Sequence, residues 1–232
     1  MKEIIPAILP KNFEDLKSKI GQMRGLVPIV QVDLCDGIFV PTITWPFRDQ
    51  DARSVDEILN EREGMPYWDE INFEFDLMVS DAVENLEKYI KLGARRLVFH
   101  IEAVGDAQEF REFIEGMDMY VKENLDIGVA LNNDTSLEII ESFIHDIDFV
   151  QLMGIANIGK QGEPFDERVL ERIEQLKAKH PDIVISIDGA VNEDSAERLL
   201  AAGADRLVIG SAIWESDDIV GALSHFKELA NQ

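Results

Sequence analysis

The sequence predicts an α/β fold, a single (β/α)8 TIM barrel, on three observations. Short apolar runs rich in β-branched residues alternate with segments of helical spacing along the chain. Eight such runs occur in 232 residues, and a barrel of eight strand–helix units has about 250 residues. Two segments form a weak internal repeat, KLGARRLVF at 91–99 and AAGADRLVI at 201–209. Each predicts the end of a helix, a glycine and the start of a new strand.

The expected strands follow one another at similar intervals. In chain order they are 3–9, 28–35, 71–79, 96–102, 126–132, 147–153, 183–188 and 206–210. Helix start signals stand between them at Asn12, Ser54 with Glu57 as a capping box, Ser80, Thr135 with Glu138, and Asn192. We therefore expect one barrel domain over residues 1–232.

A doubly wound open sheet is the alternative architecture. That fold usually carries a glycine-rich fingerprint directly after its first strand. The segment AILPKNF at 7–13, which covers the end of the first apolar run and the residues after it, contains no glycine. The barrel is therefore the favoured fold.

Composition limits the setting and the partners. A net charge of −24 argues against nucleic acid or an anionic membrane, because both need a basic patch. The single cysteine, Cys35, excludes an internal disulfide and suits a reducing cytoplasm. The N-terminal apolar run is broken by Pro6 and Pro10, so no signal peptide is expected, and no segment approaches a membrane span. We expect a cytoplasmic protein without nucleic-acid or membrane partners, and a homo-oligomer stays open.

Strand parity brings acids to one end of the predicted barrel. Alternate residues of a barrel strand face the interior, and the odd positions of 71–79 are all apolar and must face the helices. Asp76 therefore points inward, and the same reasoning turns Asp33 and Asp188 inward in the second and seventh strands. Barrel enzymes place their chemistry at this carboxyl end of the strands.

Three acids at one rim need a reason. Two carboxylates about 4 Å apart repel by ~4 kcal/mol at an effective dielectric of 20. Either some pKa values rise sharply or a cation sits among the acids. The alternative is that Asp33, Asp76 and Asp188 are separate strand-end caps bonded to loop amides. Because all three share one parity-selected rim, a functional site is favoured.

Several motifs resemble those of the ribulose-phosphate 3-epimerase family in order and spacing. They are VDLCDGIFVPTIT, FDLMVSD, FHIEA, GVALNNDT, VQLMGI, ISIDGAV and GADRLVIGSAIW, and together they span nearly the whole chain. The resemblance implies a barrel that inverts a carbon of a ketopentose phosphate. In that family two aspartates accept and donate the proton on opposite faces of the substrate, and a divalent metal stabilises the enediolate.

The resemblance assigns roles to residues of this chain. Asp33 and Asp188 match the two catalytic aspartates, Met78 and Met153 match two of three methionines that cover the site, and Cys35 stands at the third position. The phosphate of a sugar-phosphate substrate is expected on the backbone after the seventh and eighth strands, at Gly189, Ala190, Gly210 and Ser211.

The chain also departs from the family pattern. Gln31 and Asp76 stand at the positions of its two metal-binding histidines, Pro10 replaces a serine that touches substrate, and only His100 among the histidines could face the interior. The metal set implied here is Gln31, Asp33, Asp76 and Asp188. These residues offer only oxygen ligands if Gln31 presents its carbonyl, so Mg²⁺ or Mn²⁺ is favoured over Zn²⁺. The alternative is that the metal is lost and some of the acids are protonated.

Other functions stay in view. A lyase of the same superfamily would carry a lysine between acids on the third strand, and FEFDLMVSD has none. A barrel that only binds a sugar phosphate or acts as a scaffold is a further alternative, which retention of both proton-transfer aspartates disfavours. We also expect Cys35, beside two acids, to have a raised thiol pKa and no nucleophilic role. Glu74, deeper in the barrel, is expected to pair with Arg96 or Arg206.

Overall fold

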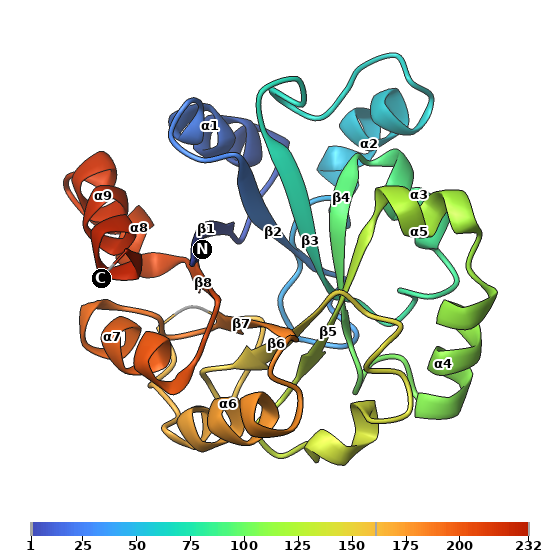
Figure 1. The fold of residues 1–232 in the computed structure, drawn as a ribbon. Coiled ribbons are helices and arrows are strands. Elements are labelled where there is room, and N and C mark those ends of the chain that lie inside the picture. The colour runs from blue at the N-terminus through green and yellow to red at the C-terminus, as the bar shows by residue number, and fades with distance from the viewer. Residues whose placement is uncertain (1, 161, 232) are drawn as a thin grey trace. The chain divides into compact units, whose positions relative to one another are not determined.

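The computed structural model describes residues 2–160 and 162–231. Within these residues eight parallel strands follow the order β1 to β8 in a closed barrel, which confirms the predicted (β/α)8 fold and excludes the open doubly wound sheet (Figure 1). The strands are β1 Glu3–Ile8, β2 Ile29–Cys35, β3 Asn72–Met78, β4 Ala94–His100, β5 Asp126–Leu131, β6 Phe149–Met153, β7 Val184–Asp188 and β8 Arg206–Ile209.

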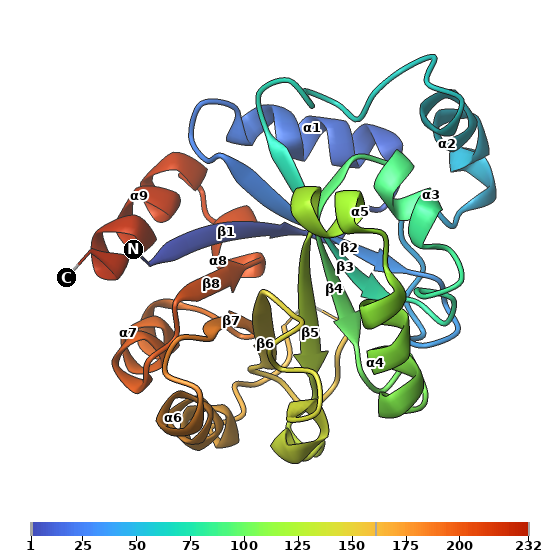
Figure 2. The ribbon, with the colours of Figure 1, turned by 45° about the vertical axis from the view of Figure 1, so that its right-hand side comes forward.

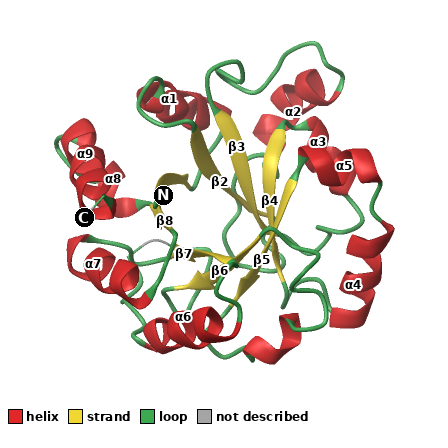
Figure 3. Cartoon of the chain, in the orientation of Figure 1, coloured by secondary structure: helices red, strands yellow, loops and turns green. Residues whose placement is uncertain are grey.

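Helical segments separate successive strands, as the colouring by secondary structure in Figure 3 makes plain. The helices are α1 Phe13–Met23, α2 Ala52–Leu59, α3 Leu86–Lys91, α4 Ala107–Gly116, α5 Met119–Asn124, α6 Arg168–Lys179, α7 Glu193–Ala202, α8 Ser211–Trp214 and α9 Ile219–Ala230. Short 3-10 turns stand at Asp49–Asp51 and Leu137–Ile140. No helix in residues 2–160 or 162–231 is long and apolar enough to cross a membrane.

The chain falls into two compact units. In the unit Ala7–Ile127, β2, β3 and β4 pair in parallel and lie side by side in Figure 2. The other unit joins Met1–Pro6 to Gly128–Gln232, and there β6, β7 and β8 pair in parallel while the start of β1 adds to β8. The expectation of one domain over 1–232 stays a prediction.

The interior side of β3 carries two buried acids. Phe73, Phe75 and Leu77 on one face of this strand are buried among apolar side chains, as parity predicts. Glu74 and Asp76 on the other face are 0% exposed. The predicted pairing of Glu74 with Arg96 is confirmed, with Oε2 and Nη1 3.4 Å apart. The alternative partner, Arg206, instead lies 3.3 Å from Glu3.

The helix start signals had mixed outcomes. Asn12 caps α1 through a hydrogen bond from the Asp15 amide, and Asn192 forms a capping box with Ser195 at the start of α7, so both of these predictions are confirmed. The predicted start at Ser54 is wrong, because α2 begins at Ala52 and the Ser54 hydroxyl donates to the backbone of Asp51.

Two further start signals are corrected. Ser80 does not begin a helix, because its hydroxyl donates to Asp36 and α3 starts only at Leu86. Thr135 is not a cap either, because Ser136 caps the short turn that follows. The Ser80 side chain, which resembles a cap, makes a different contact that the local sequence does not specify.

Candidate active site

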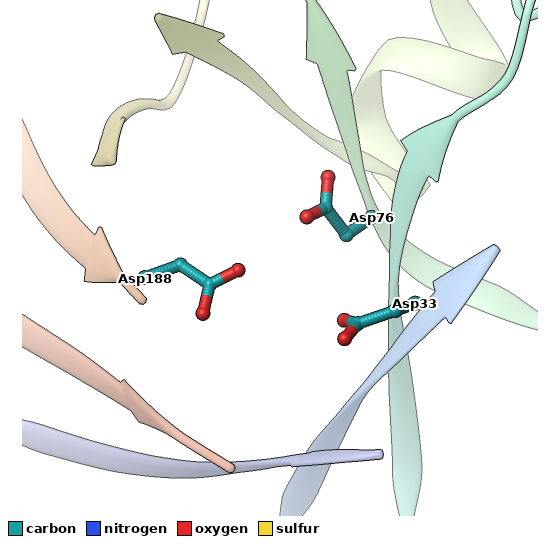
Figure 4. A group of neighbouring side chains, drawn as sticks. All are labelled: Asp33, Asp76 and Asp188. Carbon is teal, nitrogen blue, oxygen red and sulfur yellow. The ribbon is translucent and has the colours of Figure 1, made fainter. Parts of the chain in front are cut away.

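Three predicted site residues come together in the structure. Asp33 lies near the end of β2, Asp76 near the end of β3, and Asp188 at the end of β7. Each offers a carboxylate oxygen, and these oxygens lie within 4.8 Å of one another (Figure 4). At that separation two ionised carboxylates repel by about 3 kcal/mol at an effective dielectric of 20. The arrangement therefore suits a cation bound among the three oxygens.

The β2–β3 side of the site is set by strand register. Asp33 is the direct partner of Asp76 in the ladder, and Cys35 is the partner of Met78. Side chains at paired positions leave the sheet on the same face, so the two acids stand beside each other. Asp76 is fully buried, whereas Asp33 is half-buried. The pair is thus partly withdrawn from water. Outside water the dielectric is lower, so like charges repel more strongly.

Each of these two acids is hydrogen-bonded to a buried side chain. The Nε2 amide of Gln31 donates to Oδ1 of Asp33 at 2.9 Å. The imidazole Nε2 of His100 lies 2.9 Å from Oδ1 of Asp76, and both side chains are 0% exposed. The inward direction considered for His100 agrees with this burial. Its bond to Asp76 was missed from sequence, where the only signal was the position of His100 on the fourth strand.

Cys35 is buried and fixed by its neighbour Thr44. The Thr44 hydroxyl accepts a hydrogen bond from the Cys35 amide at 2.8 Å and donates to the backbone oxygen of Asp33 at 2.8 Å. Burial, followed by the charges of Asp33 and Asp76, raises the pKa of the Cys35 thiol far above its ordinary value. The predicted direction is confirmed, and a thiol of this kind is a poor nucleophile.

The loop after β2 is tied to the loop after β3 by Asp36. Its Oδ2 accepts from the amide and hydroxyl of Ser80 at 2.7 and 2.8 Å, and its Oδ1 accepts from the Ile38 and Phe39 amides. Burial works to raise the pKa of Asp36, but these hydrogen bonds hold it below its ordinary value. The contacts between Asp36 and Ser80 were not predicted from the sequence, which indicates a helix start at Ser80.

Asp188 is the last residue of β7, which lies in the second compact unit. Met153 is the register partner of Asp188 and is 2% exposed. The Gly154 amide donates to the backbone oxygen of Asp188 at 2.7 Å. A Cβ on Gly154 would lie 2.2 Å from the backbone oxygen of Gly189, so only glycine permits this close approach. The backbone after β7 is thereby held against the backbone after β6.

The predicted phosphate-binding segments follow β7 and β8. Gly189 and Ala190 both have positive φ, 97° and 50°, which turns the chain sharply after β7. The Ala190 carbonyl accepts from the hydroxyl of Ser195 at 2.9 Å, which fixes this turn to the start of α7. Gly210 directly precedes α8, whose first residue is Ser211. Both segments therefore lie where barrel proteins form phosphate sites.

A (β/α)8 barrel with an aspartate cluster at the carboxyl ends of its strands has the architecture of a barrel enzyme. The model of the ribulose-phosphate 3 epimerase family matches residues 3–214. Ribulose-phosphate 3-epimerase of Aquifex aeolicus is 30% identical, covering 99% of this chain and 97% of the relative, and that of Bacillus subtilis is 29% identical, covering 98% and 99%. The chain belongs to the ribulose-phosphate 3-epimerase family.

Solved structures of proteins with other names share the barrel. The KGPDC of Streptococcus mutans superposes with a TM-score of 0.69 at 15% identity over 99% of this chain and 97% of that one. The 3-hexulose-6-phosphate synthase of Salmonella typhimurium gives a TM-score of 0.66 at 15% identity over 100% and 99%. Identities this low show the fold alone.

Proposed function

We propose that this chain is an epimerase that inverts C3 of a phosphorylated ketose through an enediolate. Membership of the ribulose-phosphate 3-epimerase family supports the reaction class. The observation that carries the proposal is the cluster of Asp33, Asp76 and Asp188, whose carboxylate oxygens lie within 4.8 Å. The alternatives of a scaffold barrel or a lyase are not favoured, because the relatives that match over their whole length are named epimerases.

Asp33 and Asp188 are the proposed proton-transfer groups. One carboxylate takes the proton from C3. The C–H electron pair then forms the double bond of the enediolate between C3 and the carbonyl carbon, and the carbonyl oxygen takes up the negative charge. The other, as the carboxylic acid, returns a proton to C3 from the opposite face, which inverts the centre. Asp33 lies on β2 and Asp188 on β7, and the proposal assigns one of them to each face of the substrate. The reverse reaction exchanges the two roles.

The residues present fit a divalent metal ion. A cluster of oxygen ligands favours Mg²⁺ or Mn²⁺ over Zn²⁺, and positive charge would offset the repulsion among the acids. Asp33, Asp76 and Asp188 would hold it. Gln31 would join this set only if its amide turned, since its Nε2 donates to Asp33 in the structure. When bound, the metal would supply electrostatic stabilisation of the enediolate oxygens.

The remaining predicted residues are proposed to bind substrate. Met78 and Met153, 3% and 2% exposed, would present apolar surface to the sugar carbons and keep water from the carbanionic centre. Backbone amides of Gly189, Ala190, Gly210 and Ser211 would bind the phosphate. The sharp turn after β7 and the position of Gly210 before α8 support this assignment. A role in pentose phosphate metabolism in the cytoplasm is part of the same proposal.

Solvent deuterium exchange tests the proposal. Ribulose 5-phosphate is incubated in D₂O with the metal-free protein and with Mg²⁺, Mn²⁺ or Zn²⁺ added separately. We expect deuterium at C3 that depends on Mg²⁺ or Mn²⁺ and is lost by about 10²-fold or more in Asp188→Asn, the usual size of a general acid–base contribution. Asp182→Asn, an exposed acid just before β7, is the matched control. No exchange with any metal by folded protein would overturn the proposal.

A further inference from the structure

We propose that His100 is a positioning residue for Asp76, holding this carboxylate in the orientation in which it binds a divalent cation. The inference rests on the proposed function, because it concerns the same metal site. His100 itself is not a ligand in this proposal. It acts through a hydrogen bond to Asp76.

The contact between the two side chains is direct and shielded from water. Nε2 of His100 lies 2.9 Å from Oδ1 of Asp76, and both side chains are 0% exposed. An ionised carboxylate has no proton to give, so the imidazole donates from Nε2. A hydrogen bond in a site of this kind is stronger than in water and restricts rotation of the carboxylate.

The imidazole is supported on a second side by Phe39. The two ring centroids lie 5.5 Å apart with an interplanar angle of 51°. The Phe39 amide donates to Asp36 at 3.1 Å, and Asp36 is bound in turn to the amide of Ser80 just beyond β3. The loop that carries Phe39 is therefore fixed to the strand that carries Asp76, and the imidazole is held in place from both.

The neighbouring acid is held in the same manner. Gln31 donates from Nε2 to Oδ1 of Asp33 at 2.9 Å, and Asp33 is the register partner of Asp76. Two adjacent carboxylates thus each receive one N–H on Oδ1. A donor fixed in this way limits the orientations of the carboxylate that it contacts.

The test measures metal affinity on the purified full chain without substrate. Mn²⁺ binding is determined by calorimetry or electron paramagnetic resonance for wild type, His100→Met and His100→Gln. Loss of a supporting partner typically weakens metal binding about 10–100-fold. We expect a loss of this size in His100→Met and a change of less than about threefold in His100→Gln, which retains an N–H donor near the place of Nε2. His145→Met, at an exposed histidine, should change nothing.

A double-mutant cycle separates positioning from general disturbance. If His100 acts through Asp76, His100→Met should cost little further affinity in an Asp76→Asn background. The full loss in that background would overturn the inference. Should His100→Met fail to fold, His100→Gln is compared with His100→Asn, whose shorter amide does not reach the place of Nε2. Equal affinities of these two variants would also overturn it.

The outcomes distinguish this inference from the proposed function. A wild-type protein that binds no Mn²⁺ would overturn the metal site and, with it, the role of His100. Unchanged Mn²⁺ affinity in His100→Met would overturn the role of His100 alone. Deuterium exchange at C3 would still test the epimerase in that case.

Discussion

Glu74 and Asp76 lie two positions apart on β3, face the same side and are both fully buried, yet their partners differ. Glu74 lies 3.4 Å from Arg96, which also lies 3.3 Å from Asp126. Asp76 instead meets the imidazole of His100 and stands beside Asp33. The acid that pairs with an arginine of the same chain contributes to stability through a structural ion pair. The acid that meets an imidazole and stands next to a second acid is the one proposed to bind a cation.

The largest effect is expected from removing the arginine. Arg96→Met removes the guanidinium that lies 3.4 Å from the buried Glu74, and breaking one side of a buried pair costs about 3–5 kcal/mol of the free energy of unfolding. Denaturant unfolding at neutral pH measures it. The double variant Glu74→Leu with Arg96→Met should recover most of the loss, because it leaves no unpaired charge on either side chain. A loss below about 1 kcal/mol in Arg96→Met would mean that Glu74 is not held by this pair.

The second prediction concerns the ligand that Asp76 is proposed to bind. Mn²⁺ at 100 times its dissociation constant should stabilise the folded state by about 2.7 kcal/mol. For a chain of this size that raises Tm by about 5–10 °C. Thermal scans with and without a chelator measure the shift. NaCl at equal ionic strength is the control, and Asp76→Asn should lose most of the increase. An equal shift with NaCl would point to screening of the net charge of −24 instead.

Much of this arrangement could be predicted from sequence, because buried parallel strands are apolar runs whose ends are easily read. Every expected strand is present, and the end of 28–35 agrees with that of β2. Parity then turned Asp33, Asp76 and Asp188 inward, since a period of two needs no knowledge of neighbouring strands. Helix starts were less predictable, because Ser54 and Ser80 use their hydroxyls in contacts that local sequence does not reveal.

The partner of Asp76 could not be predicted, because it depends on how β3 and β4 are aligned. The ladder pairs Phe73 with Ala94 but Glu74 with Arg96, so the register shifts by one residue between these pairs. No feature of either strand's sequence announces this shift. The shift makes Arg96 the register partner of Glu74 and Val98 that of Asp76. His100, two residues beyond Val98, reaches Asp76 through its side chain.

A third acid, Asp36, extends the comparison to loops and gives a pH-dependent prediction. Its folded-state pKa is lowered, against an unfolded value of about 3.9. The stabilisation is therefore fully present above pH about 4 and is lost as the pH falls through the folded-state pKa. Asp36→Asn places an amide against the Ser80 amide and should cost about 1–2 kcal/mol at pH 7.

Urea unfolding at pH 7, 5 and 3 measures this difference between wild type and Asp36→Asn. The gap should be equal at pH 7 and 5 and smaller at pH 3, when Asp36 begins to be protonated in the wild type. Asp69→Asn, at an exposed acid, serves as the control. A gap that grows toward pH 3 would contradict the sign of the effect.

The smallest change in the free energy of unfolding is expected for Asp76→Asn, compared directly with Glu74→Gln. In the absence of metal, Asp76→Asn relieves repulsion of about 3 kcal/mol from a neighbouring carboxylate whose oxygen lies within 4.8 Å. It also weakens a charge-assisted hydrogen bond with His100 of about 1.5–3 kcal/mol. These contributions oppose each other, so the free energy of unfolding should rise by only about 0–1.5 kcal/mol. Glu74→Gln, measured in the same denaturant series, should be clearly destabilised because it removes the buried carboxylate that pairs with Arg96. If Asp76→Asn were the more destabilised of the two, the charge of Asp76 would stabilise the folded chain itself, which would contradict its proposed role in binding a cation.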